Sequence, residues 1–544
     1  MTTEKKEPEE KTERSEPGAA MKLRGSGVII HRRRRRRQDD KVDAKEILTD
    51  EEMGLKNEDS VFVWIDDVKR TLEEKVGLHQ SFDLVFREMV FGGKRTAFFY
   101  VNGFAKDTVL TDIIMRLTYL QREQVVPHAL KSFLELYISH IQVAPQDDMN
   151  KLVESVLVGS TALFIEGETS ALVIDAKTFP VRSIEEPDLE RVVRGARDGF
   201  VETLLTNVTL VRRRIRDPRL KFELLTVGDR SKTHVSIGYI QDIANPKLVE
   251  SIRDKIKSVR IDGLPLGDKQ LEEAIIGKGW NPYPSVRYSE RPDVVSAHLL
   301  EGHVILFVDT SPSVMILPTT FFHLIQHAEE YRQSPFVGSY LRWVRFIGIF
   351  SSLFLLPLWF LVVMNPDLKP AGLEFLGPQK QGSLPLLVQF LLVEIGVDLM
   401  RMAAVHTPSS LSIAMGLVAA ILVGDIAVKT GLFINEVIMY MAVAAVGMFA
   451  TPSYELGLAN RIFRLFLLCS VAIFKIPGFI IATTLWLIIL ATQRSYNAPY
   501  MWPFIPFDAK SMLSIVIRRP VLSMKIRMSL TRSQDKTRQP NKEE

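Results

Sequence analysis

Three ionisable residues interrupt a long apolar segment in the C-terminal half of the chain. In LPLLVQFLLVEIGVDLMRMAAV, residues 384–405, Glu394, Asp398 and Arg401 follow one another at spacings of four and three. These spacings place the three side chains on one face of a helix. The opposite face is apolar and includes Leu392, Ile395, Leu399 and Met400. Such a helix would turn its charged face to a protein interior or an aqueous path, and its other face to lipid or neighbouring helices.

Charges inside an apolar segment indicate either an ion pathway or helix packing. A charged side chain near the centre of a bilayer costs about 2.5 to 3.5 kcal/mol on insertion scales, so ionisable residues there are candidate sites on ion or proton pathways. Asp425 and Lys429, again four apart, repeat the pattern near the end of the next apolar segment. The alternative is that Asp398 with Arg401, and Asp425 with Lys429, form neutralising pairs that only fix packing. The second pair lies close enough to a segment end to snorkel.

The short stretch 342–345, just before the first apolar segment, has the composition typical of a cytoplasmic membrane boundary. Arg342, Trp343 and Arg345 precede a long apolar run, with cations on the inner side and an indole at the interface. We predict a membrane domain over 346–493, with segments at 346–364, 384–401, 409–428, 432–451 and 465–492. The last is too long for one straight crossing of roughly 30 Å of hydrocarbon. KIPG at 475–478, with Pro477, breaks it into a kinked span or a re-entrant hairpin.

The chain before the membrane domain reads as cytoplasmic. It has no apolar signal segment, and the one cysteine, Cys469, lies in an apolar stretch. The basic tail, 494–544, is also placed inside, so the number of crossings must be even. Four to six membrane segments are predicted, as four crossings with re-entrant segments or as six crossings. Short strands and helices recur in two units, which predicts two small α/β subdomains at 59–185 and 186–322, with a helix over 188–215 in the second. A juxtamembrane helix is expected over 323–345.

The first 58 residues are rich in Glu, Lys, Arg and Pro, and they are predicted to form a disordered charged tail. Its run Arg32–Arg37 could bind anionic lipid or RNA. A solvated charge run is favoured, because no aromatic residue interleaves for base stacking. The formal net charge of +4 on 544 residues also gives no support for nucleic acid, so no nucleic-acid partner is predicted.

Motifs for catalysis or metal binding are weak. His323 and His327 lie one helical turn apart with Glu330 nearby, but no third ligand is obvious. FGGKRT, residues 91–96, lacks the first glycine and the Lys-Ser/Thr order of a phosphate loop. No catalytic residue, metal or cofactor is therefore predicted, and the protein is not expected to be an enzyme.

Several long stretches resemble a known family. RGARDGFVETLLTNVTLVRRRIRDPRLKFELLTVGDRSKTHVSIGYI (194–240), EGHVILFVDTSPSVMILPTTF (301–321) and GDIAVKTGLFINEVIMYMAVAAVGMFATPSYELGLANRIFRL (424–465) are similar to A subunits of spore germinant receptors, the GerA family. HAEEYRQSPFVGSYLRWVRFIGIF (327–350) is closer to the stage V sporulation protein AF subgroup than to nutrient-specific A subunits. The resemblance spans about 60–508, and the arginine-rich N-terminal extension lies outside it.

The resemblance implies a multi-pass protein of the spore inner membrane. It implies a homo-oligomeric ring, a transporter-like B-type membrane subunit as a partner, and cation release during germination. The charged face of 384–405 would then line a hydrated, cation-selecting passage. Two alternatives stay open: a non-conducting scaffold that recruits germination partners through its cytoplasmic domain, and a secondary transporter with Asp425 and Lys429 in its substrate site, for which inverted repeats are not seen. The sequence does not say whether a nutrient binds.

Overall fold

The computed structural model describes residues 60–138, 140–179, 190, 192–277, 280–369, 372, 377–380, 382–406, 416, 426–496 and 498–539, with the side chains of 404–406 left aside. The predicted tail over 1–58, including Arg32–Arg37, lies outside these residues. So do Asp425 and nearly all of the predicted segment 409–428.

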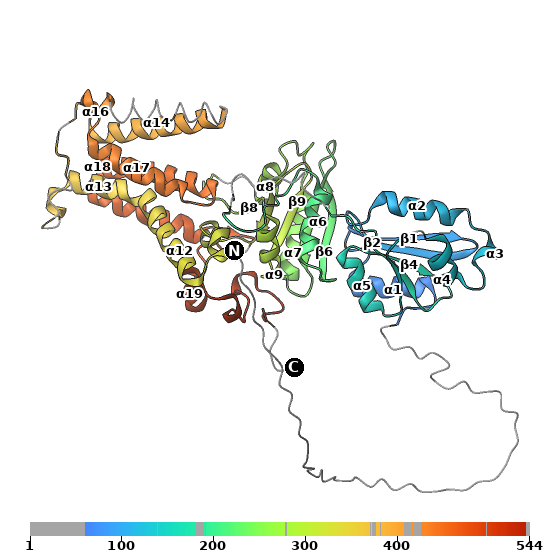
Figure 1. Cartoon of the computed structure of the whole chain (residues 1–544). Coiled ribbons are helices and arrows are strands. Elements are labelled where there is room, and N and C mark those ends of the chain that lie inside the picture. The colour runs from blue at the N-terminus through green and yellow to red at the C-terminus, as the bar shows by residue number, and fades with distance from the viewer. Residues whose placement is uncertain are drawn as a thin grey trace, which may run out of the picture. The chain divides into compact units, whose positions relative to one another are not determined.

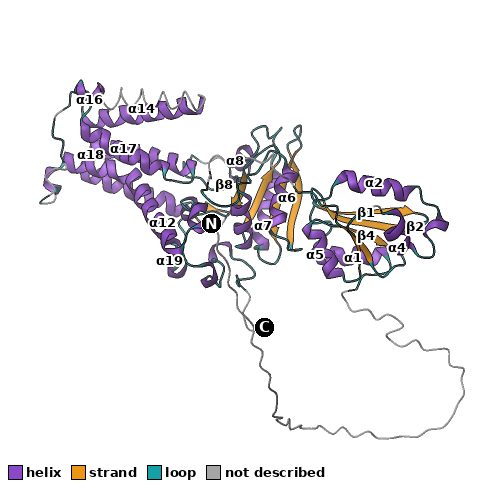
Figure 2. Ribbon diagram, in the orientation of Figure 1, coloured by secondary structure: helices purple, strands orange, loops and turns teal. Residues whose placement is uncertain are grey.

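Residues 60–179 form a five-stranded sheet with helices on both faces (Figures 1 and 2). The strands are β1 (Leu84–Phe91), β2 (Lys94–Val101), β3 (Val143–Gln146), β4 (Thr161–Ile165) and β5 (Ala171–Ile174). They are antiparallel throughout, in the order β1-β2-β4-β5-β3. The helices are α1 (Ile65–Val76), α2 (Asp107–Thr118), α3 (Arg122–Val125), α4 (Ala129–Ser132), η1 (Phe133–Tyr137) and α5 (Met149–Val158). Alternation along β2 sends Phe99 into the core under α1 and α5, and Phe98 into the core under α2. We call this unit subdomain 1.

Residues 192–317 form subdomain 2, which repeats this plan (Figure 2). Its strands are β6 (Leu220–Val227), β7 (Thr233–Ile240), β8 (Arg287–Ser289), β9 (Val304–Val308) and β10 (Val314–Leu317). Their order, β6-β7-β9-β10-β8, matches subdomain 1 position by position, and all pairs are antiparallel. Its helices are α6 (Leu204–Arg214), α7 (Pro246–Ser258), α8 (Asp268–Ile276) and α9 (Pro292–Leu300). Two mixed units of one plan were predicted, and this is confirmed.

The helix predicted over 188–215 is shorter than expected. It begins only at Leu204, and none of the described residues between 190 and 203 is helical. Backbone bonds explain the difference, because Phe200 N donates to Glu290 O and Val201 N donates to the side chain of Asn207. Gly195 also has a φ of +134°, which ends any helical path there.

Buried polar contacts join the two subdomains. Arg212 of α6 lies with its Nε 2.8 Å from Asp83 Oδ2, and both side chains are fully buried. Lys221 of β6 donates to the carbonyls of Val76 and Pro218. Because unpaired charges are costly in a protein interior, these contacts fix how subdomain 1 meets subdomain 2.

The predicted juxtamembrane helix over 323–345 is divided. It consists of α10 (Phe321–Leu324), α11 (Ala328–Arg332) and the start of α12 (Pro335–Phe350). The Ser334 side chain caps α12, and Pro335 occupies its first turn, where the missing N–H of proline costs nothing. The Ser-Pro pair therefore starts a new helix instead of continuing the old one.

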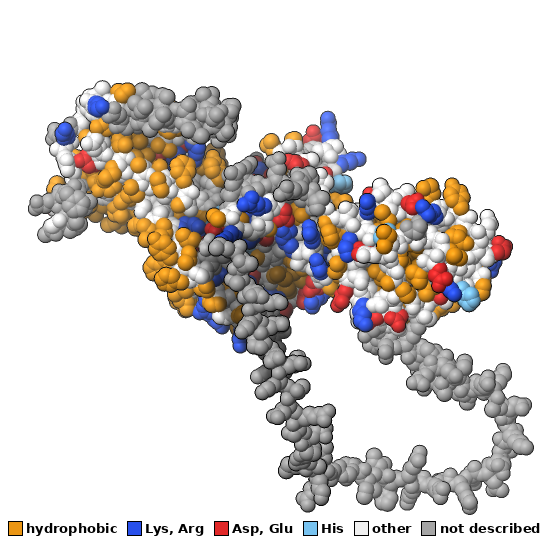
Figure 3. Space-filling model, viewed as in Figure 1, with side chains coloured by type: hydrophobic (Ala, Val, Ile, Leu, Met, Phe, Trp, Pro, Cys, Tyr) orange, Lys and Arg blue, Asp and Glu red, His pale blue; other side chains and the backbone are white. Residues whose placement is uncertain are grey.

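A helical region follows. It comprises α12, η2 (Ser351–Leu355), α13 (Leu356–Met364), η3 (Pro366–Leu368), α14 (Leu386–His406), α16 (Ala427–Lys429), α17 (Asn435–Phe449) and α18 (Tyr454–Thr492). Among the described residues, two helices are long and apolar enough to cross a membrane, Pro335–Met364 and Tyr454–Thr492. Hydrophobic side chains gather over this region on the face seen in Figure 3, whereas charged side chains are spread over the two sheet subdomains.

The helix α18 is a hairpin. Its backbone leaves the helical conformation at Lys475, with φ 52° and ψ −126°, two residues before Pro477. The two arms then run antiparallel, because Phe463 contacts Trp486 and Leu456 shares a core with Leu490. A kinked span or a re-entrant hairpin was predicted for this segment. The structure has a hairpin, and the two ends of α18 lie next to each other.

The C-terminal segment is folded onto the protein. It contains β11 (Arg494–Ser495), β12 (Ala498–Pro499), α19 (Ala509–Val516), η6 (Val521–Ser523) and η7 (Ser529–Thr531). Residues beyond η6 pack on subdomain 2, where Arg527 donates to Leu300 O and Arg538 pairs with Glu301 at 2.6 Å. We call residues 521–539 the C-terminal strap.

Candidate functional site

The carboxylate of Glu394 is enclosed by two arginines of α18. Arg464 Nε lies 2.7 Å from Glu394 Oε1, and Arg461 Nε lies 2.9 Å from Glu394 Oε2. Arg464 also donates to Ser352 O at 2.6 Å, which ties the cluster to η2. All three side chains are at most 4% exposed. Charge-assisted hydrogen bonds from two guanidiniums to one buried carboxylate are strong, so they fix α14 against α18.

Asp398 and Arg401 continue this contact toward the start of α18. Asp398 pairs with Arg461 and, at 3.0 Å, with Arg401 of its own helix. The guanidinium of Arg401 lies 5.4 Å from the ring centre of Tyr454, the first residue of α18. Asp398 is 37% exposed, so it is the carboxylate of this cluster that reaches solvent. We call Glu394, Asp398, Arg401, Arg461 and Arg464 the α14–α18 charge cluster.

The expected face of α14 exists, but it meets arginines rather than water at Glu394. All three predicted residues contact α18, whereas the opposite face of α14 exposes its apolar side chains, Leu392, Ile395, Leu399 and Met400. The Glu394 side chain is therefore buried within the single chain, and the hydrated passage expected along this face between subunits stays a prediction. Three guanidiniums against two carboxylates give the cluster a formal charge of +1.

Arg461 and Arg464 were missed because the predicted membrane segment began at residue 465. The sequence does hold a signal: in LANRIFRLF, residues 458–466, the two arginines are three apart, which places them on one face of a helix. α18 begins at Tyr454 and carries them into the packed region. Nothing in the sequence alone pairs them with a carboxylate that is about seventy residues earlier.

The remaining predicted residues take different positions. Lys429 ends α16 with an exposed side chain, and its expected partner Asp425 lies outside the described residues. Of the predicted interface anchors, only Trp343 is exposed. Arg342 and Arg345 both pair with the buried carboxylate of Glu330, with Arg342 Nε at 2.6 Å. These two arginines therefore hold α11 against α12, and their role as membrane-interface anchors stays a prediction.

A loop of subdomain 2 contacts both ends of the α18 hairpin. Tyr283 donates its hydroxyl hydrogen to Asn460 on the first arm at 3.2 Å, and Trp486 on the second arm donates to the Tyr283 hydroxyl at 2.6 Å. Gln493, which follows the second arm, donates to Tyr283 O at 3.0 Å. Burial raises the pKa of Tyr283, so its hydroxyl stays protonated and keeps its donor. Tyr283 therefore joins the base of the hairpin to subdomain 2.

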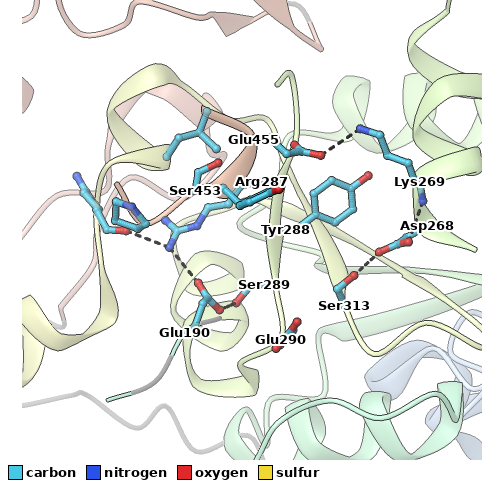
Figure 4. A pocket seen from close by; sticks show the side chains of 14 residues that line it. Glu190, Asp268, Lys269, Arg287, Tyr288, Ser289, Glu290, Ser313, Ser453 and Glu455 are labelled. Carbon is cyan, nitrogen blue, oxygen red and sulfur yellow. Dashed lines mark hydrogen bonds and ion pairs between the residues drawn. The ribbon is translucent and has the colours of Figure 1, made fainter. Parts of the chain in front are cut away.

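Next to this loop, a pocket of about 290 Å³ lies between subdomain 2 and the start of α18 (Figure 4). Lys269 of α8 reaches across it to Glu455 at 3.1 Å, and it also pairs with Glu272 at 2.6 Å. Burial opposes the charge of Lys269, but these two carboxylates outweigh it and raise its pKa. On the other side, Arg287 lies 3.7 Å from Glu190, which accepts from Ser289 (Figure 4). The charged groups here are engaged with one another, which makes the pocket a second joint between subdomain 2 and α18.

His323 and His327 do not share a site. The His323 ring packs against those of His298 and His303, with ring centres 5.9 and 5.3 Å away, while His327 caps α11 by accepting from Glu329 N. Burial lowers the pKa of His303 to about 4 and that of His323 well below its usual value, so these rings are neutral at pH 7. Within the described residues, no three His, Cys, Asp or Glu side chains are grouped so as to hold a metal ion.

The fold and the site define a class of protein in which two sheet subdomains of one topology precede a helical region. Among the residues that the structure describes, two helices of this region are long and apolar enough to cross a membrane. The sequence matches the family described as Bacillus/Clostridium GerA spore germination protein over residues 70–530, and the chain belongs to that family.

Two relatives from Bacillus subtilis and one solved structure are similar to this chain. The chain is 46% identical to stage V sporulation protein AF of Bacillus subtilis (strain 168) over 468 residues, which cover 86% of this chain and 95% of that protein. It is 26% identical to spore germination protein KA of the same strain, with 87% and 88% covered. The chain is also similar to a crystal structure of the N-terminal domain of the A subunit of the Bacillus megaterium spore germinant receptor GerK3. The sequence identity is 26% and the TM-score is 0.37, and the match covers 49% of this chain and 99% of that chain. These relatives are named as sporulation and germination proteins, not as enzymes.

Proposed function

We propose that the protein is a multi-pass subunit of a spore germination assembly in the spore inner membrane, with subdomains 1 and 2 and the C-terminal strap in the cytoplasm. Copies of the chain would form a ring with a transporter-like B-type subunit as a partner, and the ring would conduct cations during germination. The observation that carries this proposal is the enclosure of Glu394 by Arg461 and Arg464.

The charge cluster has the properties of a closed gate. Burying Glu394, Arg461 and Arg464 is costly, and replacing such groups by apolar residues is often neutral or stabilising for a fold. In the chain's present conformation, Glu394 cannot attract a cation, because two guanidiniums neutralise it. A displacement of the first arm of α18 relative to α14 would uncover Glu394 beside Asp398, which is already partly exposed. Two adjacent carboxylates in a narrow passage would then favour cations.

A cytoplasmic signal can reach this gate through α18. Subdomain 2 holds the base of the hairpin through Tyr283 and Lys269, and the same arm carries Asn460, Arg461 and Arg464. A rotation of subdomain 2 would therefore act on the arginines directly. Exposed Trp343 on α12 would mark the cytoplasmic interface of the membrane.

The test is cation flux through purified protein in liposomes. Arg464→Gln is expected to raise basal flux, because it loosens the hold on Glu394. Asp398→Asn is expected to lower cation selectivity, and Tyr283→Phe should weaken the response to partners without opening the gate. Exposed Arg260→Gln in subdomain 2 is the matched control. No flux with the complete assembly, or equal flux for Arg464→Gln and Arg260→Gln, would contradict conduction.

A non-conducting scaffold is the second candidate. It is favoured by the same burial of Glu394, because a sealed ion pair can serve packing alone. On that view no variant of the cluster conducts, replacements that preserve folding leave germination unchanged, and disruption of the cytoplasmic subdomains abolishes assembly. Co-purification of the partner subunit with each variant separates the two candidates.

A further inference from the structure

A short stretch after the α18 hairpin exposes many large apolar side chains. Phe507 is 70% exposed and Leu522 is 81% exposed. The full set lies between 504 and 526 and comprises Phe504, Ile505, Phe507, Leu513, Ile517, Val521, Leu522 and Ile526. Single exposed apolar residues are ordinary, but a concentration of this kind marks a surface that contacts a membrane or another protein.

Among these residues lies a basic pocket of about 410 Å³, formed by α19 and the C-terminal strap. Lys510, Arg519 and Lys525 line it, and none of the three side chains forms an ion pair with any residue that the structure describes. Arg527 and Arg538 also line it but are engaged by Asp535 and Glu301.

The polar lining of this pocket offers mainly positive charge. The hydroxyls of Ser511 and Ser529 donate to Asp508, and those of Ser514 and Ser523 donate to the backbone carbonyls of Lys510 and Pro520. The one acidic lining residue, Asp508, is consumed as the cap of α19, where it accepts from the backbone of Lys510 and Ser511 and from the Ser529 hydroxyl. Three cations without an ion-pair partner among the described residues, in a lining with no free carboxylate, suit a phosphate group.

The position of α19 relates this pocket to the membrane. Arg342 of α12 donates to the carbonyls of Ser514 and Ile515 at 2.9 and 2.7 Å. Arg342 lies four residues before the apolar run that begins at Phe346, so α19 packs beside the cytoplasmic end of the first span. At that level, apolar side chains can enter the acyl region while lysines and arginines meet head groups.

We propose that α19 and the C-terminal strap form a binding site for the phosphate-bearing head group of an anionic phospholipid. Lys510, Arg519 and Lys525 bind the head group, and the exposed apolar side chains around them insert among the acyl chains. The apolar rim distinguishes a lipid from free phosphate or a nucleic acid, neither of which would contact it. This inference rests on the membrane placement in the proposed function, but not on conduction.

The experiment measures lipid retained by the purified full-length protein in detergent, by native mass spectrometry. Phosphatidylglycerol is titrated against phosphatidylcholine, with inorganic phosphate as a competitor. Each cation near an anionic surface contributes roughly fivefold to binding. Lys510→Gln/Arg519→Gln/Lys525→Gln is therefore expected to lower phosphatidylglycerol retention by roughly a hundredfold, and Phe507→Gln/Leu522→Gln should lower retention of both lipids.

The matched control neutralises three exposed cations of subdomain 1, Lys106→Gln/Arg122→Gln/Lys131→Gln, and should change nothing. Equal retention of the two lipids by the wild type, or unchanged retention by the α19 triple variant, overturns the proposal. Displacement of phosphatidylglycerol by millimolar inorganic phosphate would assign the site to free phosphate and also overturn it. A protein that conducts but retains no phosphatidylglycerol contradicts this inference alone, whereas one that retains it without conducting contradicts only the channel.

Discussion

Arg464 of α18 and Glu394 of α14 form a buried ion pair, with Arg464 Nη2 2.5 Å from Glu394 Oε1 and both side chains almost inaccessible to solvent. Seventy residues separate them in the chain, so this pair fixes the packing of two helices that no local pattern relates.

Glu394→Gln should destabilise the protein strongly, because two guanidiniums lose their shared carboxylate. Removing one partner of a buried pair costs about 3 to 5 kcal/mol. Asp398→Asn should cost less, since Asp398 is 37% exposed. A cycle with Arg464→Gln, followed by thermal unfolding in detergent, should give a coupling of at least about 1 kcal/mol. Additive losses would show that the two residues act independently.

A close approach of α12 and α17 depends on one glycine. A Cβ at Gly447 would lie 2.2 Å from Gly348 O, whereas a Cβ at Gly348 would lie 3.6 Å from Ala450 Cβ and from Gly447 Cα, which is ordinary contact. Small residues allow helices to pack this closely. Gly447→Ala should therefore cost about 1 to 3 kcal/mol through forced separation.

Gly348→Ala is the internal control for this pair of helices. It should change the unfolding midpoint little, because its new methyl group fits beside Ala450. The same unfolding assay checks both variants. Equal midpoints for the two would mean that α12 and α17 are not packed as described.

Lys221 should make stability depend on alkaline pH. Burial lowers its pKa to about 8, below the usual 10.5. Between these values the unfolded chain binds more protons than the folded one, so the free energy of unfolding rises with pH by up to roughly 3 kcal/mol. Thermal midpoints at pH 8 and 10 should show a smaller rise for Lys221→Met than for the wild type. Exposed Lys247→Met should behave like the wild type.

The buried histidines should produce the corresponding effect in acid. Burial lowers the pKa values of His303 and His327 to about 4, from 6.5 in the unfolded chain. As pH falls from 6.5 to 4 the unfolded chain takes up these protons first, so stability is lost in that window. Unfolding midpoints at pH 7 and 5 should differ less for His303→Asn than for the wild type. Exposed His234→Asn should leave the difference unchanged.

Patterns within short stretches predicted much of the fold. Short strand-like runs separated by turn residues predicted two units of one plan. The length of the apolar segments distinguished the helical region from these two units. KIPG predicted the break in α18, and the structure bends there at Lys475. The helix predicted over 188–215 failed in its first half, because long-range backbone bonds such as Phe200 N to Glu290 O outweigh local helical preference.

By itself, the sequence determined that Glu394, Asp398 and Arg401 share one face of a helix, because the helical period is a local property. Only the tertiary structure decided what that face meets. A carboxylate in an apolar segment must find either water or a partner, and the choice depends on which helix packs beside it. Here the folded hairpin α18 brings Arg461 and Arg464 to Glu394, and its base brings Asn460 and Trp486 to Tyr283. These contacts arise from the packing of distant segments, which no spacing within one segment encodes.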